Sequence, residues 1–294
     1  MEVLTNLNNT PLKMKRVTNK DGTRYYEVDS GRKYPSVTTV ISKEVFNFRK
    51  LNQWKETVGL EEANKVTRQA SGLGTKVHKL NELYFSKEAP KKEPEPEVIS
   101  RHNLYLPFLD NVKPLYIEQE IYWETICQDQ YMGFAGTPDL VGVFEKPELL
   151  GLERDSPVVF LADYKNWKNS KTPDRLLTTF IQLAAYTGAV NSQRQTKIQD
   201  AFILGTTKRK LHIYHLGLRE LNWYWVWFIE ALKKYYGFES SFQRNKFEEY
   251  SVGYILEGKD EEGKNIWGQR EENYLAKKLT LNLNQEAEVD EEDS

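Results

Sequence analysis

The chain has 294 residues, of which 39% are hydrophobic and 29% charged, and its formal net charge is −2. These values are typical of a globular protein with one large domain or two small ones. They give no general basic field, although charge can still be segregated into a local basic groove. The single cysteine, Cys127, excludes a disulfide framework and a cysteine-rich zinc or iron–sulfur site, and it indicates a reducing compartment.

The first predicted elements are a hairpin and a short helix. The stretch "MKRVTNKDGTRYYEV" alternates around Asp21-Gly22, a pair that favours a two-strand turn. In "YPSVTTVIS", Pro35 ends a strand and Ser36 is suited to cap a short helix. We therefore expect an N-terminal hairpin extension over residues 1–35.

A helical region follows over residues 36–112. Residues 47–86 have helical spacing, with expected interruptions near Gly59 and at Ser71–Gly74. A linker rich in proline and charge, Glu88–Glu97, precedes another helix near Arg101–Asn111.

The centre of the chain alternates strands and helices. The stretches "PLYIEQEIYWE", "GTPDLVGVFE" and "PVVFLADYKN" predict three strands, and "PDRLLTTFIQLAAYTGAVN" predicts a helix with an apolar stripe. Two further strands, "DAFILGTT" and "KLHIYHLG", come next. This order predicts an α/β core with a mixed central sheet flanked by helices.

The C-terminal part predicts a buried helix over "ELNWYWVWFIEALKKYY" and a hairpin around "GKDEEGKN". We assign residues 113–284 to a core that includes both, within one compact domain. Residues 285–294 are too acidic and polar to pack and are expected to be a disordered tail. No apolar run is long enough to span a membrane, and the start has neither a signal-peptide core nor a transit-peptide pattern. We therefore expect a cytoplasmic protein.

Polar residues gather where two of the central strands begin or end. Asp139 follows Gly136-Thr137-Pro138, and Asp163 and Lys165 are two apart, so they share a face while Tyr164 points the other way. If the strands are neighbours, the two carboxylates repel each other unless a cation lies between them. Mg²⁺ or Mn²⁺ suits such oxygen ligands, and the Tyr164 carbonyl offers another. Each residue alone also fits an ion pair or a turn, and only the joint pattern is specific.

These residues resemble a known group of enzymes. "GTPD" followed by "DYK" resembles the PD-(D/E)XK nuclease superfamily, and "QLAAY" matches the Q-x-x-x-Y element of its RecB-like exonuclease branch. "GLGTKVHKLNE" is similar to the upstream helix of that branch, and "YPSVTTVIS" is similar to a segment near the start of the mitochondrial genome maintenance exonucleases and their phage relatives. The resemblance covers Tyr34 to Gly217, and four elements in the right order are far more specific than D-x-K alone. Many relatives have threonine where this chain has Asn166.

The resemblance implies a restriction-endonuclease-like core with an N-terminal helical extension, and it implies roles for single residues. Lys165, Asp139, Asp163, Gln182 and Tyr186 would form the catalytic set. Asp139, Asp163, the Tyr164 carbonyl, His78 and either Glu118 or Glu120 would hold the metal, with Glu118 favoured by spacing. His78 would alternatively orient a phosphate or a water.

Further residues are candidates for contact with DNA. Gln182 and Tyr186 lie four apart on one helix face, and Trp167 is suited to stack on a base. The run Lys208, Arg209 and Lys210 reads as a hairpin turn that also contacts phosphates. The stripe Trp223, Trp225, Trp227 and Phe228 favours core packing instead.

Together these features predict a Mg²⁺- or Mn²⁺-dependent DNA exonuclease that acts on single-stranded ends in replication, recombination or repair. We expect a monomer in a bacterial cell or a phage-infected host, with residues 47–86 as an arch for a free end. Two alternatives stay open: an endonuclease of the same fold, which the Q-x-x-x-Y element disfavours, and a non-catalytic DNA-binding module, which the intact Asp139, Asp163 and Lys165 disfavour.

Overall fold

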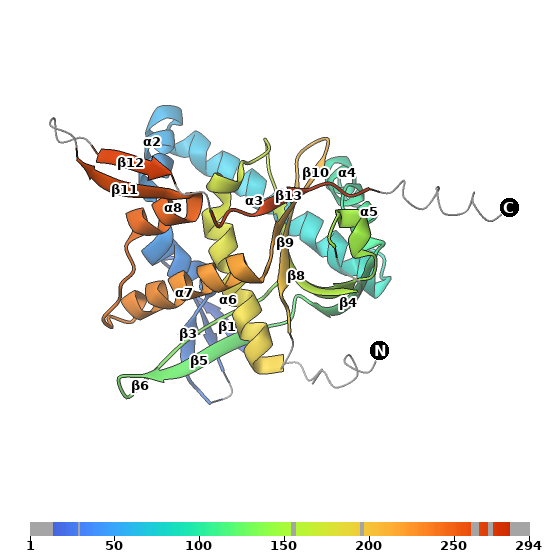
Figure 1. Ribbon diagram of the computed structural model, residues 1–294. Helices are drawn as coiled ribbons and strands as arrows, with labels where there is room; N and C mark the ends of the chain where they lie inside the picture. The colour runs from blue at the N-terminus through green and yellow to red at the C-terminus, as the bar shows by residue number, and fades with distance from the viewer. Residues whose placement is uncertain are drawn as a thin grey trace.

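The computed structural model describes residues 14–28, 30–153, 157–194, 197–259, 265–269 and 273–282. Its centre is a six-stranded mixed sheet in the order β13-β10-β9-β8-β7-β4 (Figure 1). The strands are β4 (Val112–Ile117), β7 (Leu140–Phe144), β8 (Val158–Asn166), β9 (Asp200–Thr206), β10 (Leu211–Leu216) and β13 (Lys277–Leu279). The protein therefore has the predicted α/β fold with a mixed central sheet flanked by helices.

One pair of strands in this sheet is parallel. β8 and β9 run in the same direction, and the helix α6 (Leu177–Arg194) connects them after a short turn, η3 (Pro173–Leu176). The neighbouring pairs in the sheet are antiparallel. A parallel pair requires such a crossover, and this one carries α6 back over the sheet beside the end of β8.

Both faces of the sheet are buried. Alternate residues of β8 point to opposite sides, so Leu161 packs in one core and Phe160 in the other. The Leu161 core includes α6 and α7 (Leu218–Tyr235). The Phe160 core includes α3 (Leu60–Ser86), α4 (Pro96–Asn103), α5 (Leu106–Leu109) and the turn η2 (Pro147–Leu150) (Figure 1). β8 is thereby held from both sides.

The N-terminal hairpin is confirmed. β1 (Lys15–Thr18), β2 (Arg24–Glu27) and β3 (Lys33–Pro35) form a small antiparallel sheet. Its first turn has Gly22 at φ +82°, and the Asp21 carboxylate accepts a hydrogen bond of 2.9 Å from the Thr23 amide. Ser36 caps α1 (Val37–Val40) as predicted, because its side chain accepts from the Thr39 amide at 3.0 Å. A π-helical turn, η1 (Ile41–Val45), continues α1.

One predicted helix interruption is confirmed and the other is wrong. Gly59, at φ +86°, separates α2 (Phe48–Val58) from α3. At Ser71–Gly74, however, α3 continues without a break, and the Thr75 hydroxyl donates to the Ser71 carbonyl. Glycine inside a helix costs only about 1 kcal/mol, and α3 is fixed beyond this point by buried Val77 and Asn81.

The stretch "PLYIEQEIYWE" is not the single strand that its alternation predicts. The chain bends at Glu118, which has φ +48°, and divides the stretch into β4 and β5 (Ile121–Cys127). β5 then pairs only with β6 (Gln130–Gly136), outside the central sheet. Alternation does not indicate a left-handed residue of this kind, because such a conformation is rare for side chains other than glycine.

The C-terminal predictions hold within the described residues. Residues 207–210 form the β9–β10 turn, and β11 (Tyr254–Lys259) and β12 (Asn265–Gln269) form the expected hairpin after α8 (Arg244–Val252). Buried Phe228 and the partly buried tryptophans of α7 belong to the Leu161 core, as does Val37 from the predicted helical region. The expected tail, 285–294, lies outside the described residues. Across the part of the chain described, no helix combines the length and apolarity of a membrane span.

Candidate functional site

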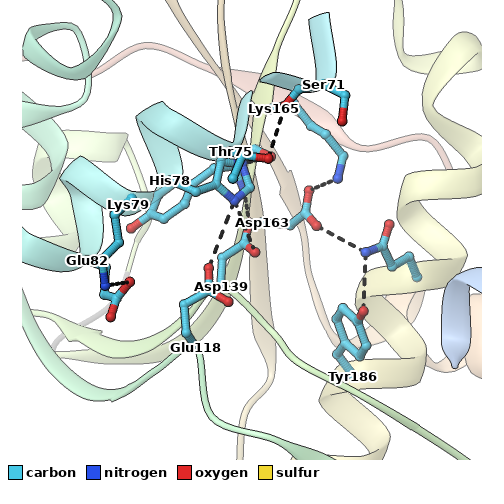
Figure 2. Close-up of polar contacts among 12 residues, drawn as sticks. Ser71, Thr75, His78, Lys79, Glu82, Glu118, Asp139, Asp163, Lys165 and Tyr186 are labelled. Carbon is cyan, nitrogen blue, oxygen red and sulfur yellow. Dashed lines mark hydrogen bonds and ion pairs between the residues drawn. The ribbon is translucent and has the colours of Figure 1, made fainter. Parts of the chain in front are cut away.

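A cavity of about 450 Å³ lies where β7 begins and β8 ends, between α3, α6 and the N-terminal hairpin. Figure 2 shows polar side chains of α3, β8, α6 and the loop before β7 that point toward one another. We call His78, Glu118 and Asp139 the acidic half of the cavity, and we call Asp163, Lys165, Gln182 and Tyr186 the lysine half.

The two strands with the acidic motifs are neighbours, as the sequence required. β7 and β8 pair antiparallel, with Leu140 opposite Ala162. Asp139 directly precedes β7, and its Oδ2 accepts a hydrogen bond of 2.6 Å from the Tyr164 amide. This contact fixes the Asp139 carboxylate against the D-x-K segment of β8.

The lysine half combines β8 with α6. Asp163 and Lys165 share a face as predicted, and Lys165 Nζ lies 2.5 Å from Asp163 Oδ2. Gln182 Nε2 donates to Asp163 Oδ1 at 3.2 Å and reaches the Tyr186 hydroxyl at 3.5 Å (Figure 2). Gln182 therefore holds the second oxygen of a carboxylate that is 3% exposed.

Gly136 of the "GTPD" motif makes room for Tyr186. A Cβ atom at this position would lie 2.5 Å from Cε1 of the Tyr186 ring, well inside van der Waals contact. The glycine is thus explained by the close approach of α6 to the strand that leads into Asp139.

The acidic half brings three distant segments together. His78, from α3, has Nδ1 at 3.5 Å from Asp139 Oδ1 and 4.0 Å from Glu118 Oε1. One ligand atom from each of the three residues lies within 4.8 Å of the others. His78 Nε2 lies 3.0 Å from the Tyr164 carbonyl oxygen, to which it donates when protonated. Histidine ligands of metals are commonly oriented in this way through the second ring nitrogen.

The bend after β4 decides between the two glutamates. Glu118 lines the cavity, and its amide donates to the Asp139 carbonyl at 3.2 Å. Glu120 is not among the lining residues. The glutamate in the cavity is thus Glu118, the one that spacing favoured. It reaches the cavity through a bend in the chain and not along a continuous strand.

Burial and crowding of like charges dominate the acidic half. Burial raises the pKa of Glu118 to about 7, and the neighbouring Asp139 adds to the rise. Burial also acts to raise the pKa of Asp139, but the charges of His78 and Lys165 outweigh it and lower that pKa below its usual value. For His78, burial lowers the pKa while Asp139 raises it, and the net shift is upward.

Charges in the lysine half largely compensate each other. Burial raises the pKa of Asp163 in spite of the opposing Lys165. Burial acts to lower the pKa of Lys165, but Asp163 and Asp139 outweigh it, so the pKa is raised. Lys165 is therefore an ammonium group at neutral pH.

The acidic half fits a hard divalent cation. Its two carboxylates and one imidazole present ligand atoms within 4.8 Å of one another, and the carboxylates of Glu82 and Asp163 line the same cavity. Carboxylate oxygens and an imidazole nitrogen are ligands that such ions accept in proteins. Ligation by Asp163 and by the Tyr164 carbonyl stays a prediction, since the first contacts Lys165 and Gln182 and the second contacts His78.

Four residues expected to bind DNA lie outside the cavity lining. Trp167 packs against Gly205, where a Cβ atom would come within 2.1 Å of its ring, and edge-on to Tyr214. The ring is thus packed on one side inside the protein, and Trp167 stays partly exposed. Lys208, Arg209 and Lys210 are exposed in the β9–β10 turn. Because Asn166 of β8 is paired with Thr206 of β9, this turn follows at the same edge of the sheet as the D-x-K segment.

The cavity also contains residues that the sequence analysis missed. They come from the N-terminal hairpin, the start of α1, the face of α3 and the loop before Asp139, and they are Arg16, Arg24, Tyr26, Ser36, Thr38, Thr75, Lys79, Glu82 and Thr137. A signal for the arginines was present, because alternation around Asp21-Gly22 places both on one face of the hairpin.

Comparison with known proteins gives a weak structural similarity. No family model matches the chain, and no curated protein matches it. Among solved structures, the crystal structure of SSO0001 is similar with a TM-score of 0.33 and 13% identity over 62% of this chain. The match spans 65% of the SSO0001 chain.

Proposed function

We propose that this protein is a metal-dependent nuclease that hydrolyses phosphodiester bonds in DNA, with Mg²⁺ or Mn²⁺ as its cofactor. The observation that carries the proposal is the meeting of Asp139, the Asp163–Lys165 pair and Gln182 in one cavity, from separate elements. The resemblance of these motifs to PD-(D/E)XK nucleases supports the same reaction.

The two halves of the cavity suit different tasks in that reaction. His78, Glu118 and Asp139 would hold the ion, which polarises the phosphoryl group and activates water when bound. Lys165 stays protonated beside the reacting phosphate, where its charge stabilises the charge that develops on the phosphoryl oxygens. Gln182 fixes Asp163, and Asp163 in turn fixes the ammonium group.

An exonuclease on single-stranded ends is the form of this activity that we favour. The Q-x-x-x-Y element and the resemblance to mitochondrial and phage exonucleases support it. The same resemblance supports a role in replication, recombination or repair. We further propose a monomer in the cytoplasm of a bacterial or phage-infected cell, which the near-neutral net charge and the sequence of the first residues favour.

The direct test compares linear with circular single-stranded DNA, in Mg²⁺, Mn²⁺ or EDTA. The wild type is tested beside Lys165→Ala and a matched control, Lys168→Ala, because Lys168 is an exposed lysine three residues further on. We expect loss of linear DNA only, dependent on metal and on Lys165 and unaffected by the control. Cutting of circles would indicate an endonuclease. Binding without cleavage under any metal would leave a DNA-binding module.

A further inference from the structure

Two arginines of the N-terminal hairpin line the cavity. Arg16 of β1 is paired with Tyr26 of β2, and Arg24 lies two residues before Tyr26, so the three side chains share one face. All three line the cavity.

The hairpin is fixed in this position. The Tyr26 hydroxyl lies 3.3 Å from Thr137 Oγ1, two residues before Asp139. The Arg24 carbonyl accepts hydrogen bonds from the Ser36 amide at 2.9 Å and from the Thr39 hydroxyl at 3.1 Å. Arg24 is thus presented to the cavity by a backbone tied to the cap of α1.

The other cations of the cavity already have partners. Lys165 pairs with Asp163, and Lys79 pairs with Glu82 at 2.7 Å. Within the described residues, Arg16 and Arg24 form no ion pair, and Arg24 Nε is buried without a hydrogen-bond partner. The acids left over are those of the acidic half. Once a divalent ion occupies it, the two guanidinium groups give the cavity an excess of positive charge.

We propose that Arg16 and Arg24 bind a phosphate group of the nucleic-acid strand, next to the phosphate that is cleaved. This inference rests on the proposed function. Guanidinium groups bind phosphate oxygens through paired, charge-assisted hydrogen bonds, and an unpaired donor such as Arg24 Nε is suited to this role. The bound group is either a backbone diester or a terminal monoester of the strand.

The test measures oligonucleotide affinity without cleavage. Anisotropy titrations in EDTA and in Ca²⁺ use 3′-labelled single strands with a 5′-phosphate or a 5′-hydroxyl, and unlabelled circles as competitors. The variant R16Q/R24Q is compared with K15Q/K20Q, which removes the same charge from exposed positions of the same hairpin outside the cavity lining. The single variant R16Q serves if the double variant does not fold, because Arg16 is exposed.

We expect R16Q/R24Q to weaken binding about tenfold, with the control close to wild type. The slope of log K against log salt should become shallower by about 0.7 for each phosphate that the variant no longer neutralises. Equal losses of affinity on all three strands assign a backbone diester, and a loss confined to the 5′-phosphorylated strand assigns a terminal monoester.

Wild-type affinity in R16Q/R24Q, or the same loss of affinity in K15Q/K20Q, would overturn the proposal. Arginine-dependent binding by a wild type that never cleaves would defeat the nuclease assignment and leave this phosphate site standing.

Discussion

The two halves of the cavity are assembled in opposite ways. The lysine half comes from β8 and α6, which follow each other in the chain, and its charges are matched within the protein. The acidic half comes from α3, the bend after β4 and the loop before β7. Among the described residues its two carboxylates have His78 as their ion-pair contact, and burial, with Asp139 nearby, raises the pKa of Glu118.

This difference indicates which half depends on a cation from outside the chain. A buried carboxylate that lacks a partner is costly. Asp163 contacts Lys165 and Gln182, whereas within the described residues Glu118 and Asp139 have His78 as their ion-pair contact and Lys165 acts on Asp139 only from beyond ion-pair distance. We therefore expect the acidic half to bind the metal ion. We expect the lysine half to stabilise the transition state without being a metal ligand. The following changes test whether the two are separable.

The largest effect is expected from Asp139→Asn. The amide still accepts the hydrogen bond from the Tyr164 amide, but the charge between His78 and Glu118 is removed. We expect cleavage to fall by about 10³-fold, because metal ligation and electrostatic stabilisation fail together. The rise in Tm on adding Mn²⁺ should disappear as well.

The matched control for this change is Asp129→Asn in the β5–β6 turn. Asp129 has φ +61°, a conformation that asparagine adopts readily, and it lies outside the cavity. If Asp139→Asn kept both cleavage and the Mn²⁺-induced rise in Tm, the acidic half would not be the metal site.

Lys165→Ala should separate the halves. We expect kcat to fall by about 10²-fold, the scale of losing one group that stabilises the transition state. The Mn²⁺-induced rise in Tm should remain, although the protein without metal loses stability because buried Asp163 loses its ion pair. Loss of the Mn²⁺ response in this variant would show that the two halves act as one metal site.

A smaller effect should distinguish the two glutamates. Glu118→Gln removes a carboxylate from the group around His78. We expect the Kd for Mn²⁺ to rise about tenfold, which is the size of effect that mutations of residues around a metal ion commonly have on metal affinity. Glu120→Gln makes the same chemical change two residues away, outside the cavity lining, and should leave the Kd unchanged. Calorimetric titration with Mn²⁺ measures the Kd of both variants. A larger rise in Kd for Glu120→Gln would mean that Glu120, and not Glu118, belongs to the metal site.

The lysine half could be predicted from the sequence because its contacts depend on residue spacing within one strand and within one helix. Period two in a strand places Asp163 beside Lys165, and a spacing of four in a helix places Gln182 beside Tyr186. Their meeting required only that β8 and α6 be adjacent. Stacking of Trp167 on a base stays a prediction, and no pattern in the sequence showed that Gly205 leaves a flat surface on which that ring packs.

The acidic half was only partly readable, since it depends on long-range placement. The position of His78 requires the full length of α3, whereas the glycines near Gly74 favour an interruption. Glu118 needed a left-handed bend in a segment that alternates like one strand. The hairpin arginines were missed because nothing local in the sequence says that Tyr26 docks on Thr137 and turns them toward the cavity.

The smallest expected effect is on the pH dependence of folding stability, measured in EDTA so that no metal is bound. The pKa of Glu118 is about 7 in the folded protein, above the value of 4.5 for a free glutamate, so the folded state binds this proton more tightly. Stability is therefore greatest below pH 4.5 as far as Glu118 is concerned, and it falls as the pH rises toward 7 and this half-buried carboxylate ionises. The raised pKa values of His78 and Asp163 act in the same direction.

Thermal unfolding at about pH 5 and about pH 8 in EDTA measures this fall. Glu118→Gln should reduce the difference in Tm between the two pH values without abolishing it, because the other groups remain. Glu120→Gln should retain the wild-type difference, and Mn²⁺ should restore the wild type at the higher pH by neutralising the acidic half. An unchanged difference in Glu118→Gln would mean that burial of Glu118 beside Asp139 is not what lowers stability at the higher pH, and the contrast between the two halves would then lose its electrostatic basis.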